Sequence, residues 1–584
     1  MIDMSATHTL KGQPYVRGEA RGPVIASALE LSFWGGVDPV TGEVIDRHHP
    51  LSGRHLTDHI LAIPGGRGSC TGSGVLLELL LNGKAPKAML FEREEDILTL
   101  GVIIAEELFE TSIPVVVLSP ADFQTVLHTR AVSISDGKVT CLGDDDAGTS
   151  VHSSADPVLD EAVDRMRLSD LDKALLAGNL GKAPQIAMRI ILRMARLLGA
   201  SELMDVAQVH IDGCIYTGSG SLAFAERLRE LGGRVVVPTS LNAISVDSAR
   251  WRSQGIDPAF GDPASRLAEA YVDMGARPTF TCAPYLLDTA PKFGSQVAWA
   301  ESNAVVYANS VLGARTMKYP DFLDICIALT GRAPAAGAHL SLHRGATLEV
   351  AVHAPETIDD AFYPLLGYRV GELAANRIPV ITGLEHSAPS LDDLKAFGAA
   401  FATVSSAPMF HIAGVTPEAP NVASALSTKN PVESIVLTAR ELAASFEELN
   451  TADGGRVDLI ALGNPHFSFS EIEKLASLCR GRVKHADTAV IVTSGRAIYE
   501  RAREQGLVAE LERFGVQFVT NTCWCMITDP LIPPAARIIM TNSGKFAHYG
   551  PGLTGRRFFF GSLQACVDAA VAGKHRKTLP LWLY

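Results

Sequence analysis

Short apolar runs alternate with turn residues along most of the chain. Near the N-terminus, four such runs are bounded by glycine, proline or polar residues, which is typical of strands. They occupy residues 24–33, 59–66, 87–92 and 113–119. Residues 73–83 and 96–110, which lie between these runs, carry apolar side chains at helical spacing. The pattern predicts a small βα domain.

A second pattern begins at residue 168. Ser169 is a candidate N-cap, and residues 184–200 form an amphipathic helical segment that ends at a glycine. Helical segments then alternate with apolar runs, and such alternation favours parallel sheets packed between helices. The predicted strands are residues 206–213, 234–240, 278–285, 379–384, 457–465, 488–495, 516–523 and 536–544.

These patterns predict an α/β protein with three parts. Residues 1–150 form the small domain, and residues 168–584 form a large region with parallel sheets. The stretch between them, residues 151–167, is expected to be a linker because an Asp-, Gly- and Ser-rich sequence leads into it.

Composition excludes several classes of protein. The 584 residues suffice for several domains, and 47% hydrophobic content is too apolar for a disordered chain. A net charge of -13 makes nucleic acid a poor partner. Nine scattered cysteines do not resemble a secreted disulfide framework, and no apolar leader or membrane segment is evident. We expect a cytoplasmic protein.

The sharpest local motif is the glycine-rich turn at residues 64–74, between a predicted strand and a predicted helix. Its backbone N–H groups at a helix N-terminus suit an anion. Arg67 could clamp a carboxylate, and Ser69 and Cys70 are two candidate proton acceptors. The motif is not a P-loop, because no Gly-Lys-Ser/Thr sequence follows the glycines. The alternative interpretation is a tight turn that binds nothing.

Two cysteines lie where an apolar run meets a turn, a place where active-site loops of α/β folds occur. They are Cys282 in the sequence TCAPY and Cys523 in NTCWC. Cys523 and Cys525 would point to opposite faces of an extended segment, which favours one ligand from that pair. Any of these cysteines could instead be a packing residue. A metal cluster held by three cysteines from separate parts of the chain is a further alternative.

Further polar candidates lie at predicted strand ends and turns. Gly213 and Cys214 follow one apolar run, and Asn242 follows the next. Ser302, Asn303 and Lys545 could likewise face a substrate. Helix caps or exposed loops are the alternative interpretation of these last residues.

Taken in order, these motifs resemble the aconitase X family over nearly the whole chain. The segments GPVIAS, PGGRGSCTGSG and NGKAPKAMLFE are similar to its swivel domain. The segments TFTCAPYLL, WAESNAVVYANSVLGART, NTCWC and TNSGKFAHYGPGL are similar to its large catalytic part. The arrangement in one chain resembles the bacterial type, which dehydrates cis-3-hydroxy-L-proline. The resemblance implies a cleft between the two parts.

The resemblance also implies an iron-sulfur hydro-lyase. Cys282, Cys523 and Cys566 match the three cluster ligands, and Ser69 matches the catalytic serine, with Cys70 as the alternative base. The implied cluster is [2Fe-2S], with [3Fe-4S] and [4Fe-4S] as alternatives. Arg67, Cys70, Gly213, Cys214, Asn242, Ser302, Asn303 and Lys545 are the implied substrate neighbours. Cys141, Cys326, Cys479 and Cys525 are expected to be packing residues.

Three further expectations concern substrate and partners. The substrate is a cyclic hydroxy amino acid, and the enzyme acts as a monomer that binds neither nucleic acid nor membrane. A related dehydratase acting on mevalonate 5-phosphate or another hydroxy acid is the alternative enzyme. An iron-responsive RNA-binding protein is the alternative outside enzymes, and the acidic charge argues against it.

Overall fold

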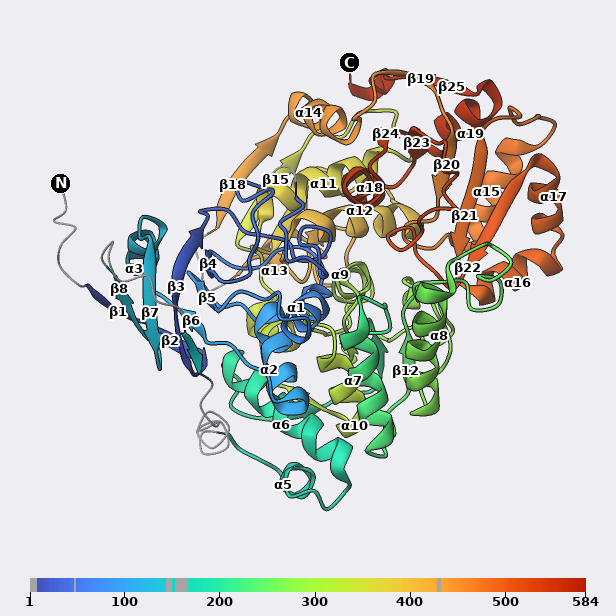
Figure 1. The fold of residues 1–584 in the computed structure, drawn as a ribbon. Helices are drawn as coiled ribbons and strands as arrows, with labels where there is room; N and C mark the ends of the chain where they lie inside the picture. The colour runs from blue at the N-terminus through green and yellow to red at the C-terminus, as the bar shows by residue number, and fades with distance from the viewer. Residues whose placement is uncertain (1–7, 47–48, 143–149, 153–165, 428–431, 584) are drawn as a thin grey trace. The chain divides into compact units, whose positions relative to one another are not determined.

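The computed structural model describes residues 8–46, 49–142, 150–152, 166–427 and 432–583. Its residues group into two units. The first comprises Met1–Pro238, Asp273–Gly275 and Tyr319–Ala336, and the second comprises Thr239–Val272, Ala276–Lys318 and Gly337–Tyr584. Most of the expected linker, residues 151–167, lies outside the described residues. Figure 1 follows the chain through its elements.

The N-terminal part of the first unit is built on a mixed sheet. Strands β3 to β6 pair in parallel, and antiparallel strands flank them in the order β1-β8-β7-β3-β4-β5-β6-β2, with β9 also pairing β3. The strands are β1 (Thr9–Lys11), β2 (Gln13–Val16), β3 (Glu19–Ala26), β4 (Ile60–Ile63), β5 (Ala88–Phe91), β6 (Val115–Val117), β7 (Ala131–Ser135), β8 (Lys138–Cys141) and β9 (Ser150–His152).

Helices connect the parallel strands, as the apolar spacing predicts. Helices α1 (Gly72–Leu81) and α2 (Ile97–Phe109) pack against each other, and α3 (Pro120–Leu127) follows β6. All of β4 and β5 is buried, since a strand in the middle of a sheet covered by helices meets no water. The predicted strands at 59–66, 87–92 and 113–119 and both predicted helices are confirmed. The run at 24–33 forms a strand only up to Ala26.

The rest of the first unit is mainly helical. Ser169 caps α5 with a reciprocal bond to Asp172, which confirms the predicted cap. The buried guanidinium of Arg193 on α6 pairs with Glu106 and Glu107 of α2, at 3.0 and 3.2 Å. The elements are α5 (Asp170–Leu176), α6 (Lys182–Leu197), β10 (Leu203–Asp205), β11 (Val209–Ile211), α7 (Ser219–Glu230), α10 (Leu323–Thr330) and β14 (Arg332–Pro334).

The second unit contains two parallel sheets. One has the order β17-β16-β15-β18 and the other β22-β21-β20-β23-β24, while β19 and β25 pair separately. The strands are β12 (Thr239–Leu241), β13 (Ala298–Trp299), β15 (Leu348–Val352), β16 (Pro379–Thr382), β17 (His411–Ile412), β18 (Glu433–Leu437), β19 (Gly454–Arg456), β20 (Leu459–Leu462), β21 (Ala489–Ser494), β22 (Val516–Thr520), β23 (Ile538–Thr541), β24 (Arg557–Phe560) and β25 (Lys574–Arg576).

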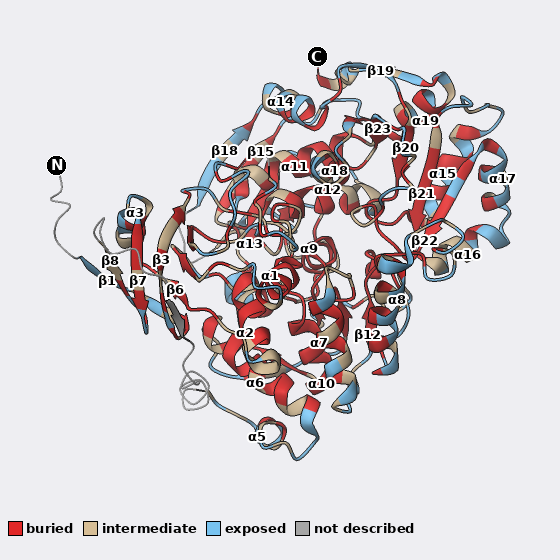
Figure 2. Cartoon of the chain, viewed as in Figure 1, coloured by how far each residue is buried: buried red, intermediate tan, exposed pale blue. Residues whose placement is uncertain are grey.

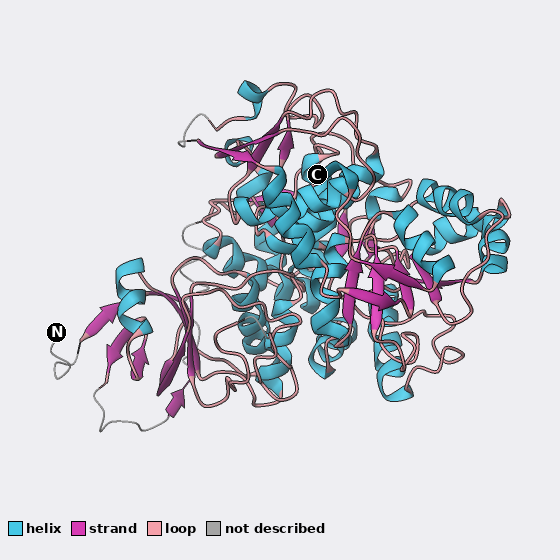
Figure 3. Cartoon of the chain, turned by 90° about the horizontal axis from the view of Figure 1, so that it is seen from above, coloured by secondary structure: helices cyan, strands magenta, loops and turns pink. Residues whose placement is uncertain are grey.

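Helices connect the strands of these sheets, and Figure 3 shows helices (cyan) beside strands (magenta). The helices are α8 (Pro258–Asp273), α9 (Ser302–Ser310), α11 (Phe362–Ala374), α12 (Leu391–Val404), α13 (Val422–Ala425), α14 (Ala439–Leu449), α15 (Phe469–Cys479), α16 (Arg496–Glu504), α17 (Leu507–Phe514), α18 (Gly544–Thr554) and α19 (Leu563–Ala572), with 3-10 turns η1 (Pro284–Leu286), η2 (Gly337–His339), η3 (Ser341–His343) and η4 (Leu581–Leu583). Figure 2 shows the sheet interiors buried.

One predicted strand, at 278–285, is wrong, and another, at 234–240, is shorter than predicted. Residues 278–285 form a loop that ends in η1, because Pro278 has no N–H and Phe280 takes a positive φ of 42°. In the place of a strand ladder, the hydroxyl of Thr279 bonds both backbone groups of Leu241, at 2.9 Å each. The segment 234–240 is extended only from Thr239.

The α/β fold with parallel sheets is confirmed. Among the helices that the structure describes, none combines the length and the apolar content that a membrane span requires.

Candidate active site

Three cysteines of the second unit come together. Cys282 and Cys523 are buried in one cluster with Ala243, and Cys525 packs against it. The thiol of Cys523 forms hydrogen bonds with the thiols of both other cysteines. We call these residues the thiol cluster. Its members come from the loop before η1 and from the turn after β22.

The turn after β22 explains why Cys525 joins the cluster. Residues 523–525 are not extended, and the N–H of Met526 donates to the carbonyl of Cys523 at 2.9 Å. Asn521 enters the turn with a φ of 67°. Because a turn removes the alternation of side chains along a strand, Cys523 and Cys525 can face the same way. Cys525 was expected to be a packing residue, whereas the structure places it beside Cys282 and Cys523.

A loop after β20 supplies polar groups to the thiol cluster. The backbone N–H of His466 donates to the Cys282 sulfur at 3.3 Å. The side-chain amide of Asn464 donates to the Cys525 sulfur at 3.6 Å. Hydrogen bonds of this kind stabilise a thiolate. They therefore favour metal binding at these sulfurs.

His466 itself holds the cluster in place as a neutral ring. Its Nε2 donates to the carbonyl of Thr522 at 2.7 Å, so its Nδ1 accepts from the hydroxyl of Thr281 at 3.2 Å. Burial lowers the pKa of His466 to about 4, which keeps the ring uncharged near neutral pH. The ring joins the two loops that carry Cys282 and Cys523.

Lys545 lies beside the thiol cluster in a buried ion pair. Its Nζ is 2.9 Å from a carboxylate oxygen of Glu301, the N-cap of α9. Burial alone would lower the pKa of Lys545, but Glu301 and the three cysteines raise it well above its ordinary value. Burial would raise the pKa of Glu301, yet Lys545 holds it below its ordinary value. Both groups are therefore charged, and Lys545 is a fixed cation next to the sulfurs.

Asn303 positions the backbone of Cys282. Its amide nitrogen donates to the Cys282 carbonyl at 3.1 Å, and its amide oxygen accepts from the hydroxyl of Tyr285 at 2.8 Å. Ser302 is buried at the start of the same helix, and Asn242 is buried with its amide oxygen bound to the N–H of Ala243 at 2.7 Å. The structure thus brings Asn303 and Lys545 to the thiol cluster, and Asn242 directly precedes Ala243, which packs against the cluster.

Cys566 lies elsewhere. It is on α19, fully buried in an apolar core with residues such as Phe467, Leu475 and Val567. Burial raises the pKa of its thiol well above the ordinary value. The structure does not bring Cys566 to Cys282 and Cys523, and its surroundings are those of a packing residue.

The glycine-rich turn joins β4 to α1 in the first unit. Gly68 has a φ of 84°, which favours glycine, and a Cβ on Gly66 would lie 2.8 Å from a carboxylate oxygen of Glu95, which would have to move. Ser69 is partly exposed, whereas Cys70 is fully buried. Of the two candidate bases, the structure therefore leaves only Ser69 accessible to a substrate.

Ser69 and Arg67 are oriented by neighbours in the same unit. The N–H of Thr71 donates to the Ser69 oxygen at 3.3 Å, and the Ser69 hydroxyl donates to the Thr71 hydroxyl at 3.1 Å. Arg67 is half-exposed and contacts Asp46 at 3.1 Å. The α1 N-terminus and the N–H of Thr71 both favour negative charge on the Ser69 oxygen.

Gly213 and Cys214 follow β11 in the first unit, next to three buried aspartates. The N–H of Gly213 donates to Asp324 at 3.3 Å. Cys214 is fully buried, and burial, with Asp212, Asp324 and Asp321, raises its pKa well above the ordinary value. Its thiol stays protonated and enclosed, which does not suit direct contact with a substrate. No local motif in the sequence indicated Asp321 or Asp324.

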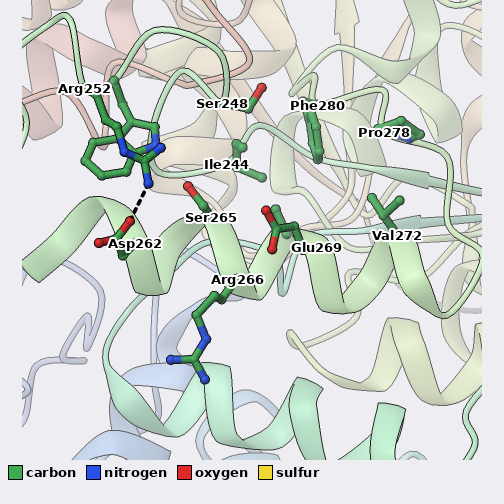
Figure 4. A pocket seen from close by; sticks show the side chains of 12 residues that line it. Ile244, Ser248, Arg252, Asp262, Ser265, Arg266, Glu269, Val272, Pro278 and Phe280 are labelled. Atoms are coloured by element: carbon green, nitrogen blue, oxygen red, sulfur yellow. Dashed lines mark hydrogen bonds and ion pairs between the residues drawn. The ribbon is translucent and has the colours of Figure 1, made fainter. Parts of the chain in front are cut away.

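Two of the cavities among the described residues lie in the second unit. A cavity of about 520 Å³ lies against α8, and Figure 4 shows that Arg252 and Asp262, 2.7 Å apart, form part of its wall. None of the residues predicted for the site lines it. The other, about 20 Å³, is lined by Asn464, Ser543 and Gly544 and others, so it lies beside groups that hold the thiol cluster. Its volume suffices for one water molecule.

The chain was compared with protein families, with curated proteins and with solved structures. Models of the aconitase X swivel, first, second and third domains match residues 9–141, 165–342, 346–447 and 457–572. A cis-3-hydroxy-L-proline dehydratase of Hypocrea jecorina is 61% identical over 98% of this chain and 96% of its own length. The protein belongs to the aconitase X family.

Other relatives in the aconitase X family agree with this assignment. A cis-3-hydroxy-L-proline dehydratase of Pseudomonas aeruginosa is 52% identical over 99% of both chains. The phosphomevalonate dehydratase large subunit of Methanothermobacter thermautotrophicus is 35% identical over 67% of this chain and 96% of its own. Aconitase X of Thermococcus kodakaraensis (holo-form) superposes with a TM-score of 0.62, at 30% identity, over 69% of this chain and 100% of that one.

Aconitase X proteins are generally of iron-sulfur type, and the thiol cluster fits such a group. Soft thiolates are the ligands of iron-sulfur clusters, and three of them leave an iron coordination position for substrate. Within the described ranges, no three His, Cys, Asp or Glu side chains are already spaced around a metal ion. The Cys523 thiol bonds those of Cys282 and Cys525, and cysteine binds a metal as the thiolate, so metal binding is coupled to proton release.

Glu95, which packs under Gly66 of the glycine-rich turn, gives the first unit a pH dependence. Burial, with the charge of Asp96, raises the pKa of Glu95 to about 8 from 4.5. The folded state therefore keeps a proton that the unfolded state loses, so stability falls as pH rises from about 4.5 to about 8, by up to about 5 kcal/mol. We expect Glu95→Gln to flatten this dependence, measured by hydrogen exchange of α2. The exposed Glu94→Gln variant should retain it, and an unchanged slope in Glu95→Gln would contradict the assignment.

Proposed function

We propose that this aconitase X protein is a hydro-lyase that removes water from cis-3-hydroxy-L-proline to give 1-pyrroline-2-carboxylate. The observation that carries the proposal is the identity of 61% and 52% to relatives of that name, each over nearly the whole of both chains. The phosphomevalonate dehydratase subunit is less similar and corresponds to only two thirds of this chain.

The reaction requires a base and an acceptor for hydroxide on opposite faces of the substrate ring. In the cis isomer the hydroxyl and the carboxylate share one face, so the hydrogen on the α carbon is on the other. Ser69 is the proposed base. Its deprotonated oxygen is stabilised by the N–H of Thr71 and by the N-terminus of α1. Arg67, whose half-exposed side chain contacts Asp46, is proposed to bind the substrate carboxylate.

We propose Cys282, Cys523 and Cys525 as the ligands of a [2Fe-2S] cluster, with Cys525 in place of Cys566. The support is the hydrogen bonding of the three thiols and the separate location of Cys566. When bound, such a cluster supplies a Lewis-acidic iron for the departing hydroxide. Lys545 adds positive charge that stabilises thiolates, and Asn303 and His466 fix the two loops.

The remaining predicted residues receive supporting roles in this proposal. Asn242 and Ser302 hold the loops around Cys282, and Gly213 and Cys214 belong to the buried support of the glycine-rich turn. None of the nine cysteines, which all lie among the described residues, forms a disulfide, and we infer a reducing compartment such as the cytoplasm. We infer a monomer that acts on a small molecule, because the swivel and catalytic domains share one chain.

A substrate panel tests the proposal. Anaerobically purified protein should convert cis-3-hydroxy-L-proline to the cyclic imine, detected by its reaction with o-aminobenzaldehyde, and should leave mevalonate 5-phosphate unchanged. If protein that contains iron converts mevalonate 5-phosphate and not cis-3-hydroxy-L-proline, the substrate assignment is overturned. The assignment of the protein as a hydro-lyase would then still stand.

A further inference from the structure

A chain of hydrogen bonds leads from Ser69 into the interior of the first unit. The Ser69 hydroxyl donates to the hydroxyl of Thr71 at 3.1 Å. The Thr71 hydroxyl in turn bonds the carboxylate of Asp321, and Asp321 shares a hydrogen bond with Asp212. The Ser69 hydroxyl thus donates toward the interior. That direction is the one in which a proton must move if Ser69 is to become a base.

Thr71 is placed for this contact and not for capping. It occupies the N-cap position of α1, where a threonine normally accepts a bond from the first helical turn, yet it makes no side-chain cap bond. Its side chain is only 1% exposed. The hydroxyl of Thr71 therefore serves Ser69 and Asp321.

Backbone bonds hold Asp321 against the glycine-rich turn. The N–H of Asp321 donates to the Cys70 carbonyl at 3.3 Å. The hydroxyl of Ser73 bonds two carbonyls, that of Cys70 at 3.0 Å and that of Asp321 at 3.2 Å. These contacts fix the carboxylate of Asp321 relative to Thr71, although 250 residues separate the two in sequence.

Asp321 is a carboxylate with capacity for a proton. It is 2% exposed, and its Oδ1 accepts no hydrogen bond from the residues that the structure describes. Burial, with the charges of Asp212 and Asp324, raises its pKa well above the ordinary value. Two acids in such close contact share a proton and bind it jointly. Cys214 faces the same group, as the effect of Asp321 on its thiol shows.

Asp324 has a different role, although it lies three residues further on. Its two oxygens accept four backbone N–H bonds, those of Asp212, Gly213, Phe322 and Ile325, at distances from 2.6 to 3.3 Å. With its acceptor positions filled in this way, Asp324 fixes the backbone around β11 and α10. Asp321 is the carboxylate that remains open to Thr71.

We propose that Thr71 and Asp321 form a proton relay that converts Ser69 into a base; this inference rests on the proposed function, in which Ser69 removes the α proton. The Ser69 proton moves to the Thr71 oxygen as the Thr71 proton moves to the Asp321–Asp212 pair. The α proton then binds to the Ser69 oxygen, and the electron pair of the broken C–H bond forms the double bond as hydroxide leaves. After product release Ser69 gives its proton to water, and the relay runs back.

Variants of Thr71 test the relay. Thr71→Val should lower kcat about 10- to 100-fold with KM nearly unchanged, because the relay touches no part of the substrate. Thr71→Ser, which keeps the hydroxyl, should recover most of the loss. Asp321→Asn should lower kcat similarly and shift the acidic limb of the pH profile of kcat/KM. Thr330→Val is the matched control, since that buried hydroxyl bonds only backbone groups of α10 and of Arg332 in β14, and should change neither.

A double variant separates this inference from the proposed function. Thr71→Val should have no further effect in a Ser69→Ala background, because the relay acts only through Ser69. Full activity of Thr71→Val with an inactive Ser69→Ala would overturn the relay and leave Ser69 as the base. Full activity of Ser69→Ala would overturn the base assignment itself. If Asp321→Asn does not fold, the pair Thr71→Val and Thr71→Ser decides the question.

Discussion

Replacing Cys282, Cys523 or Cys525 with alanine is expected to remove the iron-sulfur cluster and to reduce dehydration to background. Each thiol is a proposed ligand, and a cluster left with two protein ligands is not retained through purification. Iron and acid-labile sulfide counts, with the visible absorbance of the purified variants, give the measurement. The expected loss is nearly complete in all three variants.

Cys566 and Cys479 provide matched controls, because both are buried in the same separate apolar core. Alanine at either position should keep the iron and sulfide content of the natural protein and most of its activity. Loss of the cluster in Cys566→Ala, together with its retention in Cys525→Ala, would contradict the ligand set that we propose. That result would instead support Cys282, Cys523 and Cys566, the three ligands that the resemblance implies.

Replacing Ser69 with alanine is expected to lower kcat/KM about 10³- to 10⁴-fold while the iron and sulfide content stays unchanged. The reason is that the α proton of an amino acid is weakly acidic and its removal needs a positioned base. Steady-state kinetics on anaerobic protein with a measured iron content provides the number. The variant should fold normally, because Ser69 is partly exposed and its neighbours bond to backbone groups as well.

Cys70 is the control for the serine. Its side chain is fully buried, so Cys70→Ala should keep activity within about an order of magnitude, the loss coming from repacking below the turn. The reverse ranking, an inactive Cys70→Ala beside an active Ser69→Ala, would reassign the base to the thiol.

The local pattern of apolar and polar residues is sufficient to predict much of the fold. The buried strands β4, β5 and β6 and the helices α1 and α2 follow directly from apolar runs and helical spacing, because a buried element must be apolar along its whole length or one face. The pattern of residues 278–285 predicts a strand, where the structure has a loop. Its β-branched and aromatic residues suit a strand, but Pro278 and the bonds of Thr279 to Leu241 prevent a ladder.

The site was predictable only where a motif is local. The glycine-rich turn with Ser69 stands out in sequence because every part of it lies within eleven residues. The thiol cluster and the contact of Thr71 with Asp321 join residues hundreds of positions apart, which a single sequence cannot place together. The sequence NPH at 464–466 follows a buried strand, and its position at a strand end was the one signal for the groups around the thiols.

The most direct test of the account compares the two epimers at the hydroxyl carbon. Anti elimination by a base on one face and iron on the other requires the α hydrogen and the hydroxyl to lie on opposite faces of the ring. Anaerobic protein with its full iron content should therefore form 1-pyrroline-2-carboxylate from cis-3-hydroxy-L-proline and none from trans-3-hydroxy-L-proline. Equal turnover of both epimers, or no product from the cis epimer, would contradict the account.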